Sequence, residues 1–102
     1  MGLNKEEKNA VYLAGRYAAI VEICNERKLS AAQFGNIQRQ PGIYLPMYDA
    51  HPEKMSEERM EILSLLDSDS FPKKVESLEE QGKIYIGYYH QLSAITPVLE
   101  KI

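Results

Sequence analysis

Residues 78–91 read LEEQGKIYIGYYHQ, and the conformation of this stretch decides the fold. The β-branched and aromatic content of residues 83–89 is typical of a strand. A strand here would be apolar on both faces, and no partner strand is visible elsewhere in the sequence. On a helix, by contrast, the apolar side chains fall within one broad arc, which contains Leu78, Ile84, Tyr85, Tyr88, Tyr89, Leu92 and Ile95. We therefore predict a helix, with its tyrosines pointing inward.

The polar residues support this helix. Glu79, Lys83 and His90 fall on the side opposite the apolar arc, so lysine and histidine should face solvent. Ser77 is followed three residues later by glutamate, as in a capping box. We expect the helix to end near Thr96, because the proline that follows cannot continue it cleanly.

The N-terminal region predicts a second long helix. Asn4 and Glu7 have the spacing of a capping box, and no proline intervenes before about Lys28. Apolar residues recur at intervals of three and four and form a main stripe of Ala10, Leu13, Ala14, Tyr17, Ile20, Val21 and Cys24. Tyr12, Ala19 and Ile23 form a second apolar patch on nearly the opposite side of the helix. A helix that is apolar on two sides is usually central in a bundle.

The middle of the chain predicts shorter elements. Residues 30–40 should form a short helix that stops before Pro41. Residues 41–50 are apolar and contain Pro46, which suggests a short or kinked helix. Pro52 can start another helix, which runs to Asp67, with a loop over residues 67–72. The expected fold is all-α, a single compact bundle of about five helices formed by residues 1–102.

Two glycines lie inside the predicted long helices. Gly15 and Gly87 each cost about 1 kcal/mol relative to alanine in a helix interior. One interpretation is the close approach of another backbone, with these two helices crossing each other. The alternative is that both are simply tolerated.

Charge and composition limit the possible functions. The chain has 102 residues and a net charge of −3, which argues against a generic nucleic-acid-binding protein. The excess negative charge lies in residues 53–71, which hold two basic and six acidic residues, so a basic surface elsewhere remains possible. We expect a cytoplasmic protein, because Cys24 has no disulfide partner and neither a signal peptide nor a membrane-spanning stretch is visible.

No catalytic or metal-binding motif stands out, so we expect a non-enzymatic protein without a cofactor. One cysteine and two histidines are too few for a structural zinc site. A nucleophilic Cys24–His90 pair is conceivable, but Cys24 lies on the apolar stripe and a buried thiol is the better interpretation. Residues 67–70, DSDS, resemble the start of a calcium loop but lack its glycine and its closing glutamate.

The remaining candidates are basic residues that could contact nucleic acid. Cations interleaved with aromatic rings suit single-stranded nucleic acid, where phosphates pair with cations and bases stack on rings. The candidates are Arg16, Arg27, Lys28, Arg39, Lys73, Lys74, Lys83 and His90. On residues alone, a solvated surface is the simpler interpretation of these charges, and Arg16 could instead be a buried arginine that packs between helices.

A family resemblance favours the nucleic-acid interpretation. Residues 78–91 resemble the closing signature, EQG…GYYHQ, of the large subunit of the CRISPR-associated type I-C Cascade complex. Residues 9–22, NAVYLAGRYAAIVE, are similar to the family's Y-L-x-G-R…A-x-x-E helix, and residues 41–47, PGIYLPM, to its P-x-x-[VI]-[FY]-x-P segment. Phe71-Pro72 matches a further F-P pair. The chain departs from the family between the first helix and the acidic one, where it is shorter and more acidic.

This resemblance implies a specific role. A chain that begins with its own Met1 and covers only this region looks like the separately made small subunit of that complex. In the family this subunit is a helical bundle without catalytic activity, present in more than one copy beside the large and backbone subunits. It stabilises the duplex of CRISPR RNA and target DNA and holds the displaced strand. The alternatives are an excised C-terminal domain of the large subunit, or an assembly module that does not touch nucleic acid.

Overall fold

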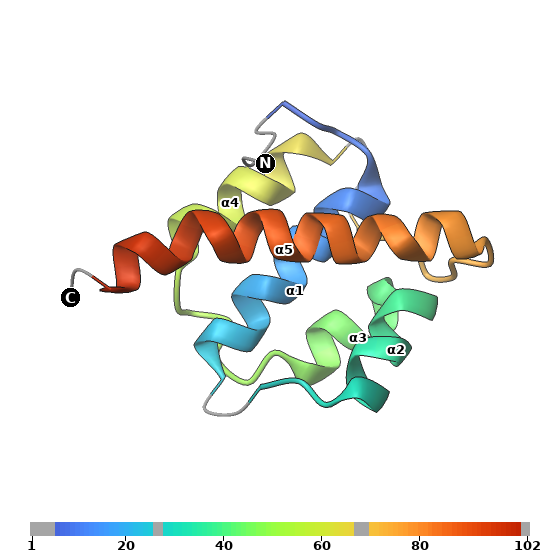
Figure 1. Cartoon of the computed structure of the whole chain (residues 1–102), viewed down its shortest axis with the longest axis horizontal. Coiled ribbons are helices and arrows are strands. Elements are labelled where there is room, and N and C mark those ends of the chain that lie inside the picture. Colours follow the sequence, from blue (N-terminus) through green and yellow to red (C-terminus); the bar gives the residue numbers. More distant parts are fainter. Residues whose placement is uncertain (1–5, 26–27, 67–69, 101–102) are drawn as a thin grey trace.

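Helix α1 (Ala10–Cys24) occupies the centre of the molecule, and the other helices pack around it. The computed structural model describes residues 6–25, 28–66 and 70–100, with side chains described as far as residue 95. The surrounding helices are α2 (Ala31–Arg39), α3 (Pro41–Tyr48), α4 (Ser56–Leu65) and α5 (Leu78–Glu100), as Figure 1 shows. These described ranges contain no strand. The all-α prediction of about five helices is therefore confirmed.

Helix α1 is buried on nearly all sides, as its two apolar faces predict. Leu13, Ala14, Ile20 and Val21 have no exposed surface. The helix begins later than predicted, however, because Asn9 caps it by accepting hydrogen bonds from the backbone nitrogens of Val11 and Tyr12 at 3.0 and 3.1 Å. The prediction that Glu7 lies in the first turn was wrong, since Glu7 instead accepts a hydrogen bond from the Asn9 nitrogen. Asn4 lies outside the described residues.

The packing of α1 against α5 depends on the two mid-helix glycines. A Cβ atom built on Gly15 would lie 2.8 Å from the Ile84 carbonyl carbon and 2.9 Å from the Tyr88 nitrogen. A Cβ atom on Gly87 would lie 3.1 Å from both the Tyr12 carbonyl carbon and the Arg16 nitrogen. The helices cross with their backbones in contact (Figure 1), which favours the first interpretation of these glycines.

Helices α2 and α3 follow each other almost without a break. Ser30 and Gln33 form a complete capping box at the start of α2. Pro41 then begins α3, and Pro46 lies inside this short helix, as residues 41–50 predicted. Two backbone hydrogen bonds hold the segment before α5 against this junction, from the Val75 nitrogen to the Arg39 oxygen and from the Gly42 nitrogen to the Pro72 oxygen.

Helix α4 begins at Ser56, four residues after the proline that was expected to start it. Met55 precedes it in the left-handed conformation, with φ 55°, and a residue in that conformation cannot continue a helix. Pro52 lies in the preceding turn, and the helix ends at Leu65 rather than Asp67. Ile62 is fully buried, and Met55, Leu65 and Leu66 pack against the core.

Helix α5 confirms the helical interpretation of residues 78–91. The Ser77 hydroxyl accepts a hydrogen bond from the Glu80 nitrogen at 3.4 Å, near the expected start. The predicted end near Thr96 was wrong, because the helix continues through Pro97 to Glu100. Pro97 has no backbone N–H to donate, yet the helix extends three residues beyond it.

The five helices form a compact globule with a radius of gyration of 12.5 Å. Its core combines α1 with one or two residues from each of the other helices, including Phe34, Ile37, Leu45, Ile62 and Ile84. None of the helices in the described part of the chain is long and apolar enough to cross a membrane.

Candidate nucleic-acid interface

The eight basic candidates do not form one continuous surface. Arg16 is in the interior, and Arg27 lies outside the described residues. The other six fall into three separate places, each described below: Lys83 and His90; Arg39, Lys73 and Lys74; and Lys28.

Arg16 is a buried packing residue rather than a surface cation. Its side chain is 1% exposed. Its Nε donates a hydrogen bond to Gln91 Oε1 at 2.7 Å, and its Nη2 lies 3.2 Å from Glu61 Oε1. Nη1 is buried without a hydrogen-bond partner among the residues described. Arg16 therefore joins α1 to α4 and α5 and is not available to a phosphate in this arrangement, which supports the alternative interpretation of this residue.

Lys83 and His90 lie together beside the start of α1. They line a hollow of about 290 Å³ with Glu7, Asn9, Tyr12 and Ile86. His90 Nδ1 is hydrogen-bonded to the Tyr12 hydroxyl at 2.8 Å, and the two rings meet edge to face. The shared face predicted for Lys83 and His90 is confirmed, although both side chains are half-buried and a carboxylate shares their hollow.

The tyrosines of α5 differ from the sequence-based expectation. Tyr85 and Tyr89 are 44% and 56% exposed, while Tyr88 is half-buried. The prediction that all three point inward was wrong, because Gly87 contacts α1 and sets the orientation of the helix. Residues two positions from Gly87 lie about 200° around the helix, and so Tyr85 and Tyr89 point outward. The glycine itself was the sequence signal that could have predicted this.

The outward rings form an ordered aromatic surface. Tyr85 and Tyr89 are nearly parallel, with an interplanar angle of 14° and centroids 6.2 Å apart. The ring of Phe34 on α2 packs against the ring of Tyr85, with 4.7 Å between the ring centroids. The rings of Tyr88 and Tyr89 are in contact with 5.1 Å between their centroids. A second hollow, of about 380 Å³, is lined by Tyr85, Ile86, Tyr89, His90 and Ser93. This aromatic hollow and the Lys83 hollow share Ile86 and His90, so they are adjacent on α5.

Tyr88 anchors this aromatic surface to α1. Its hydroxyl donates a hydrogen bond to Glu22 Oε1, while Glu22 Oε2 accepts one from the Leu29 nitrogen at 3.0 Å. Burial of the phenol is the main cause that raises the pKa of Tyr88 well above its ordinary value, and the hydrogen bond to Glu22 raises it further. The phenol therefore stays neutral at any physiological pH and keeps donating its proton.

Arg39, Lys73 and Lys74 lie near the junction of α2 and the segment before α5. Arg39 and Lys74 line a hollow of about 460 Å³, and Lys73 is exposed beside it. Lys74 pairs with Glu76 at 3.2 Å, and Arg39 Nη2 donates to Asn36 Oδ1 at 2.9 Å. These partners compete with a phosphate for both cations.

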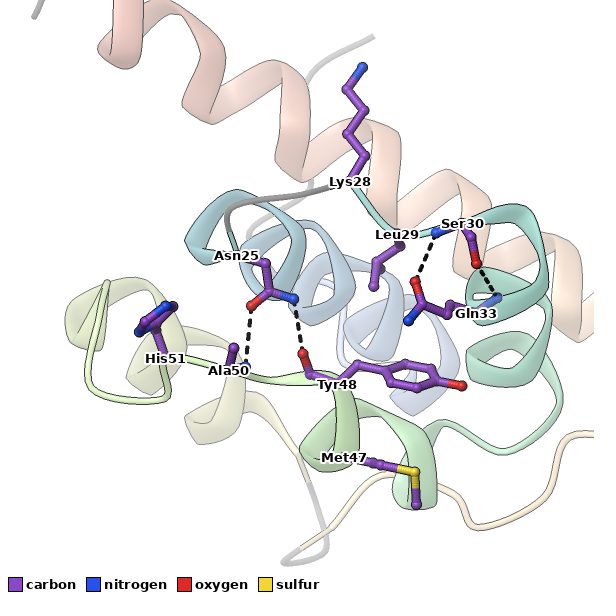
Figure 2. A pocket seen from close by; sticks show the side chains of 9 residues that line it. All are labelled: Asn25, Lys28, Leu29, Ser30, Gln33, Met47, Tyr48, Ala50 and His51. Atoms are coloured by element: carbon purple, nitrogen blue, oxygen red, sulfur yellow. Dashed lines mark hydrogen bonds between the residues drawn. The ribbon is translucent and has the colours of Figure 1, made fainter.

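Lys28 stands apart from the other cations. It is exposed at the rim of an open hollow of about 880 Å³ between the start of α2 and the end of α3 (Figure 2). Asn25 crosses the floor of this hollow, donating to the Tyr48 oxygen at 2.9 Å and accepting from the Ala50 nitrogen at 3.2 Å. In Figure 2, Lys28 points away at the top of the view and His51 lies at its left.

A buried ion pair that the sequence did not reveal holds the turn before α4. Arg59 is 4% exposed, and its Nη2 donates to Asp49 Oδ1 at 3.0 Å. It also donates to the backbone oxygens of His51 and Lys54 and to the Tyr17 hydroxyl. Burial alone would lower the pKa of Arg59, but the hydrogen bonds with Asp49 and Tyr17 raise it overall. This arginine is therefore committed to the fold.

The residues considered for other chemistry are placed as follows. Cys24 is buried at 6% exposure on α1, and His90 bonds to Tyr12. Within the described ranges no group of three or more histidine, cysteine or acidic side chains is placed to hold a metal ion. Residues 67–69 of the calcium-like run lie outside the described residues.

No protein-family model matches this sequence, and a search of curated proteins finds no match.

Proposed function

We propose that this chain is the non-catalytic small subunit of a type I-C Cascade complex in antiviral defence. In this role it binds beside the large subunit, the backbone subunits and a neighbouring copy of itself. It stabilises the duplex of CRISPR RNA and target DNA and the displaced DNA strand by contacts that do not depend on sequence. The motifs in residues 9–22, 41–47 and 78–91 support the family, and the all-helical fold agrees with it.

One structural observation supports single-strand binding most directly. Tyr85 and Tyr89 present two nearly parallel exposed rings on α5, adjacent to Lys83 and His90. Bases stack on exposed aromatic rings without sequence preference, while a neighbouring cation attracts the phosphates. The aromatic hollow between Tyr85 and Ser93 has no carboxylate in its lining. We therefore place the displaced strand along the outer face of α5.

The test is binding of the isolated chain to a fluorescent single-stranded oligonucleotide at low salt. Stacking on an aromatic ring contributes about 1–3 kcal/mol per base, so the double variant Tyr85→Ala/Tyr89→Ala should raise Kd about tenfold or more. Met47→Ala/Met60→Ala is the control, because it removes two exposed side chains, 65% and 66% exposed, from α3 and α4. Equal Kd values for the tyrosine variant and the control would exclude α5 as the binding face.

A second candidate function is a pure assembly module. The net charge of −3 and the exposed apolar residues of α5, Leu78 at 84% and Ile86 at 49%, favour it. In that case the oligonucleotide would not bind even at low salt. Expression of the untagged operon tests membership of the complex for either function, since a protein of this chain's mass should purify with the other subunits.

A further inference from the structure

An apolar groove lies on the part of the surface formed by α3, α4 and the turn between them. It has a volume of about 410 Å³ and is lined by Tyr17, Gly42, Leu45, Pro46, Asp49, Pro52, Leu63, Ser70 and Phe71. Most of these side chains are aliphatic, aromatic or proline. The groove shares no lining residue with the hollows that contain Lys83 and His90.

The apolar surface continues from the groove along α4. Leu63 is 40% exposed at the groove, and Met60 is 66% exposed one turn earlier. These residues and Glu57 follow at three-residue intervals, so they form one line along the exposed side of the helix. The exposed side of α4 therefore presents Leu63 at the groove, then Met60, and then the carboxylate of Glu57.

The charge on α4 and on the turn before it is negative. Glu53 and Glu57 are exposed, and Glu61 is 43% exposed although it pairs with Arg16. Arg59 does not offset them at the surface, because it and Asp49 neutralise each other with side chains that are each 5% exposed. Of the cations described in α4 and the turn before it, only Lys54 is exposed. A phosphate backbone would be repelled here, whereas lysine or arginine side chains would be attracted.

The walls of the groove are held in place before anything binds. Arg59 fixes the turn through bonds to the His51 and Lys54 oxygens, at 2.9 and 2.6 Å. The Gly42 nitrogen donates to the Pro72 oxygen at 2.8 Å and holds the opposite wall. A preformed site loses less conformational entropy on binding than one that must order first.

We propose that this groove binds a basic amphipathic helix of a partner protein. The apolar side chains of the partner helix pack on Leu63, Met60 and the groove floor, and its lysine or arginine residues pair with Glu53 and Glu57. This inference stands independently of nucleic-acid binding by α5, because it uses a different surface. Helix-in-groove recognition of this kind uses apolar anchors at helical spacing for affinity and flanking charge for orientation.

The experiment measures binding of the full chain to a fluorescent model peptide of leucine and lysine, arranged so that one helical face is apolar. A leucine and glutamate peptide with the same apolar face is the comparison. We expect the lysine peptide to bind at least tenfold more tightly than the glutamate peptide. Equal binding of the two peptides would overturn the proposal.

Variants of the chain locate the binding. Met60→Gln/Leu63→Gln should raise the Kd of the lysine peptide about tenfold, whereas Leu78→Gln, an exposed residue at the start of α5, should leave it unchanged. Glu53→Gln/Glu57→Gln should raise the Kd of the lysine peptide and should reduce the salt dependence of that Kd. Both effects should be larger than those of the matched pair Glu79→Gln/Glu80→Gln in the first turn of α5. All of these residues are exposed, so circular dichroism should show intact helices.

Two results would contradict the proposal. One is an equal effect of the α4 and α5 variants, which would indicate non-specific attraction. The other is self-association of the unmodified chain, detected by sedimentation and abolished by Met60→Gln/Leu63→Gln, which would assign the groove to a second copy of this chain.

Discussion

At the scale of single residues, side chains that look like surface groups in the sequence hold the helices together. Arg16 and Arg59 are both buried and bonded inside the protein. Glu22 links α1 to α5 through Tyr88 and to the start of α2 through the Leu29 nitrogen. Breaking one partner of such a contact leaves a polar group without its hydrogen bond, which is more damaging than losing an exposed charge.

Replacement of Tyr88 by phenylalanine tests the link between α1 and α5. Hydrogen bonds to charged groups contribute about 1.5–3 kcal/mol, so Tyr88→Phe should lower the free energy of unfolding by about 1.5 kcal/mol. Urea denaturation at pH 7 measures this change. Tyr89→Phe is the control, because it removes a hydroxyl from an exposed ring on the same helix and should have almost no effect.

The same tyrosine should make stability depend on alkaline pH. The pKa of Tyr88 in the folded chain lies above its ordinary value of 10.0, so folding favours the neutral phenol. Its contribution to stability is fully present below about pH 10 and is lost as the pH rises from there toward the folded pKa. Tyr88→Phe should therefore lose less stability than the unmodified chain between pH 9 and pH 11. Parallel pH profiles for the two proteins would refute this.

At the scale of helices, the crossing of α1 and α5 determines which side of each helix is buried. Ile84, Gly87 and Gln91 face α1, and the exposed positions of α5 follow from that choice. The glycines therefore control both the packing distance and the orientation of the outward tyrosines.

Substitution of Gly87 tests this crossing, and α5 itself provides a matched control. Gly87→Ala would place a Cβ against the Tyr12 carbonyl. The clash is with backbone atoms, which cannot move aside without shifting the whole helix, so the free energy of unfolding should fall by about 3 kcal/mol. Gly82→Ala should raise stability by about 0.5–1 kcal/mol, because no described residue outside its own helical turn has an atom within 4 Å of the added Cβ and alanine favours the helix. Thermal denaturation distinguishes the two. A loss of less than 1 kcal/mol for Gly87→Ala would show that the helices can separate freely.

The comparison of sequence and structure is also clearest for the helices. Periodicity and proline placement predicted the helical class, the central position of the first helix and the short helices at residues 31–39 and 41–48. They did not predict the starts of α1 and α4, because the sequence offers Asn9 as well as Asn4 as a cap. The left-handed conformation of Met55 is uncommon for a residue other than glycine and has no signal in the sequence. For the interface, the shared face of Lys83 and His90 was predictable, whereas the burial of Arg16 required knowledge of which helix covers it.

At the scale of the whole molecule, charge is distributed unevenly among the elements. Carboxylates dominate α4 and the turn before it, while the described cations that remain exposed or half-exposed lie mainly at the ends of α2 and near the start of α5. A surface arranged in this way can attract a nucleic acid and a basic protein at different places despite its modest net charge.

The salt dependence of strand binding should reveal which cations take part. Each phosphate neutralised on a single strand contributes about 0.7 to the slope of log K against log salt. Lys83→Ala should reduce the magnitude of the slope by about this amount. The triple variant Lys73→Ala/Lys74→Ala/Lys83→Ala should reduce it further. Lys54→Ala, in the acidic turn, is the control and should leave the slope unchanged. Fluorescence anisotropy across a salt series provides the measurement, and an unchanged slope in the triple lysine variant would rule out these contacts.

The pairing of α1 with α5 has a consequence for how the protein is made. The central helix emerges from the ribosome well before the helix that covers its Gly15 face. Until α5 has been added, the apolar side chains of α1 that it covers stay exposed, and such exposed surface promotes aggregation of incomplete chains. A chain truncated before α5 should therefore expose the buried face of α1 and should not reach the compact fold.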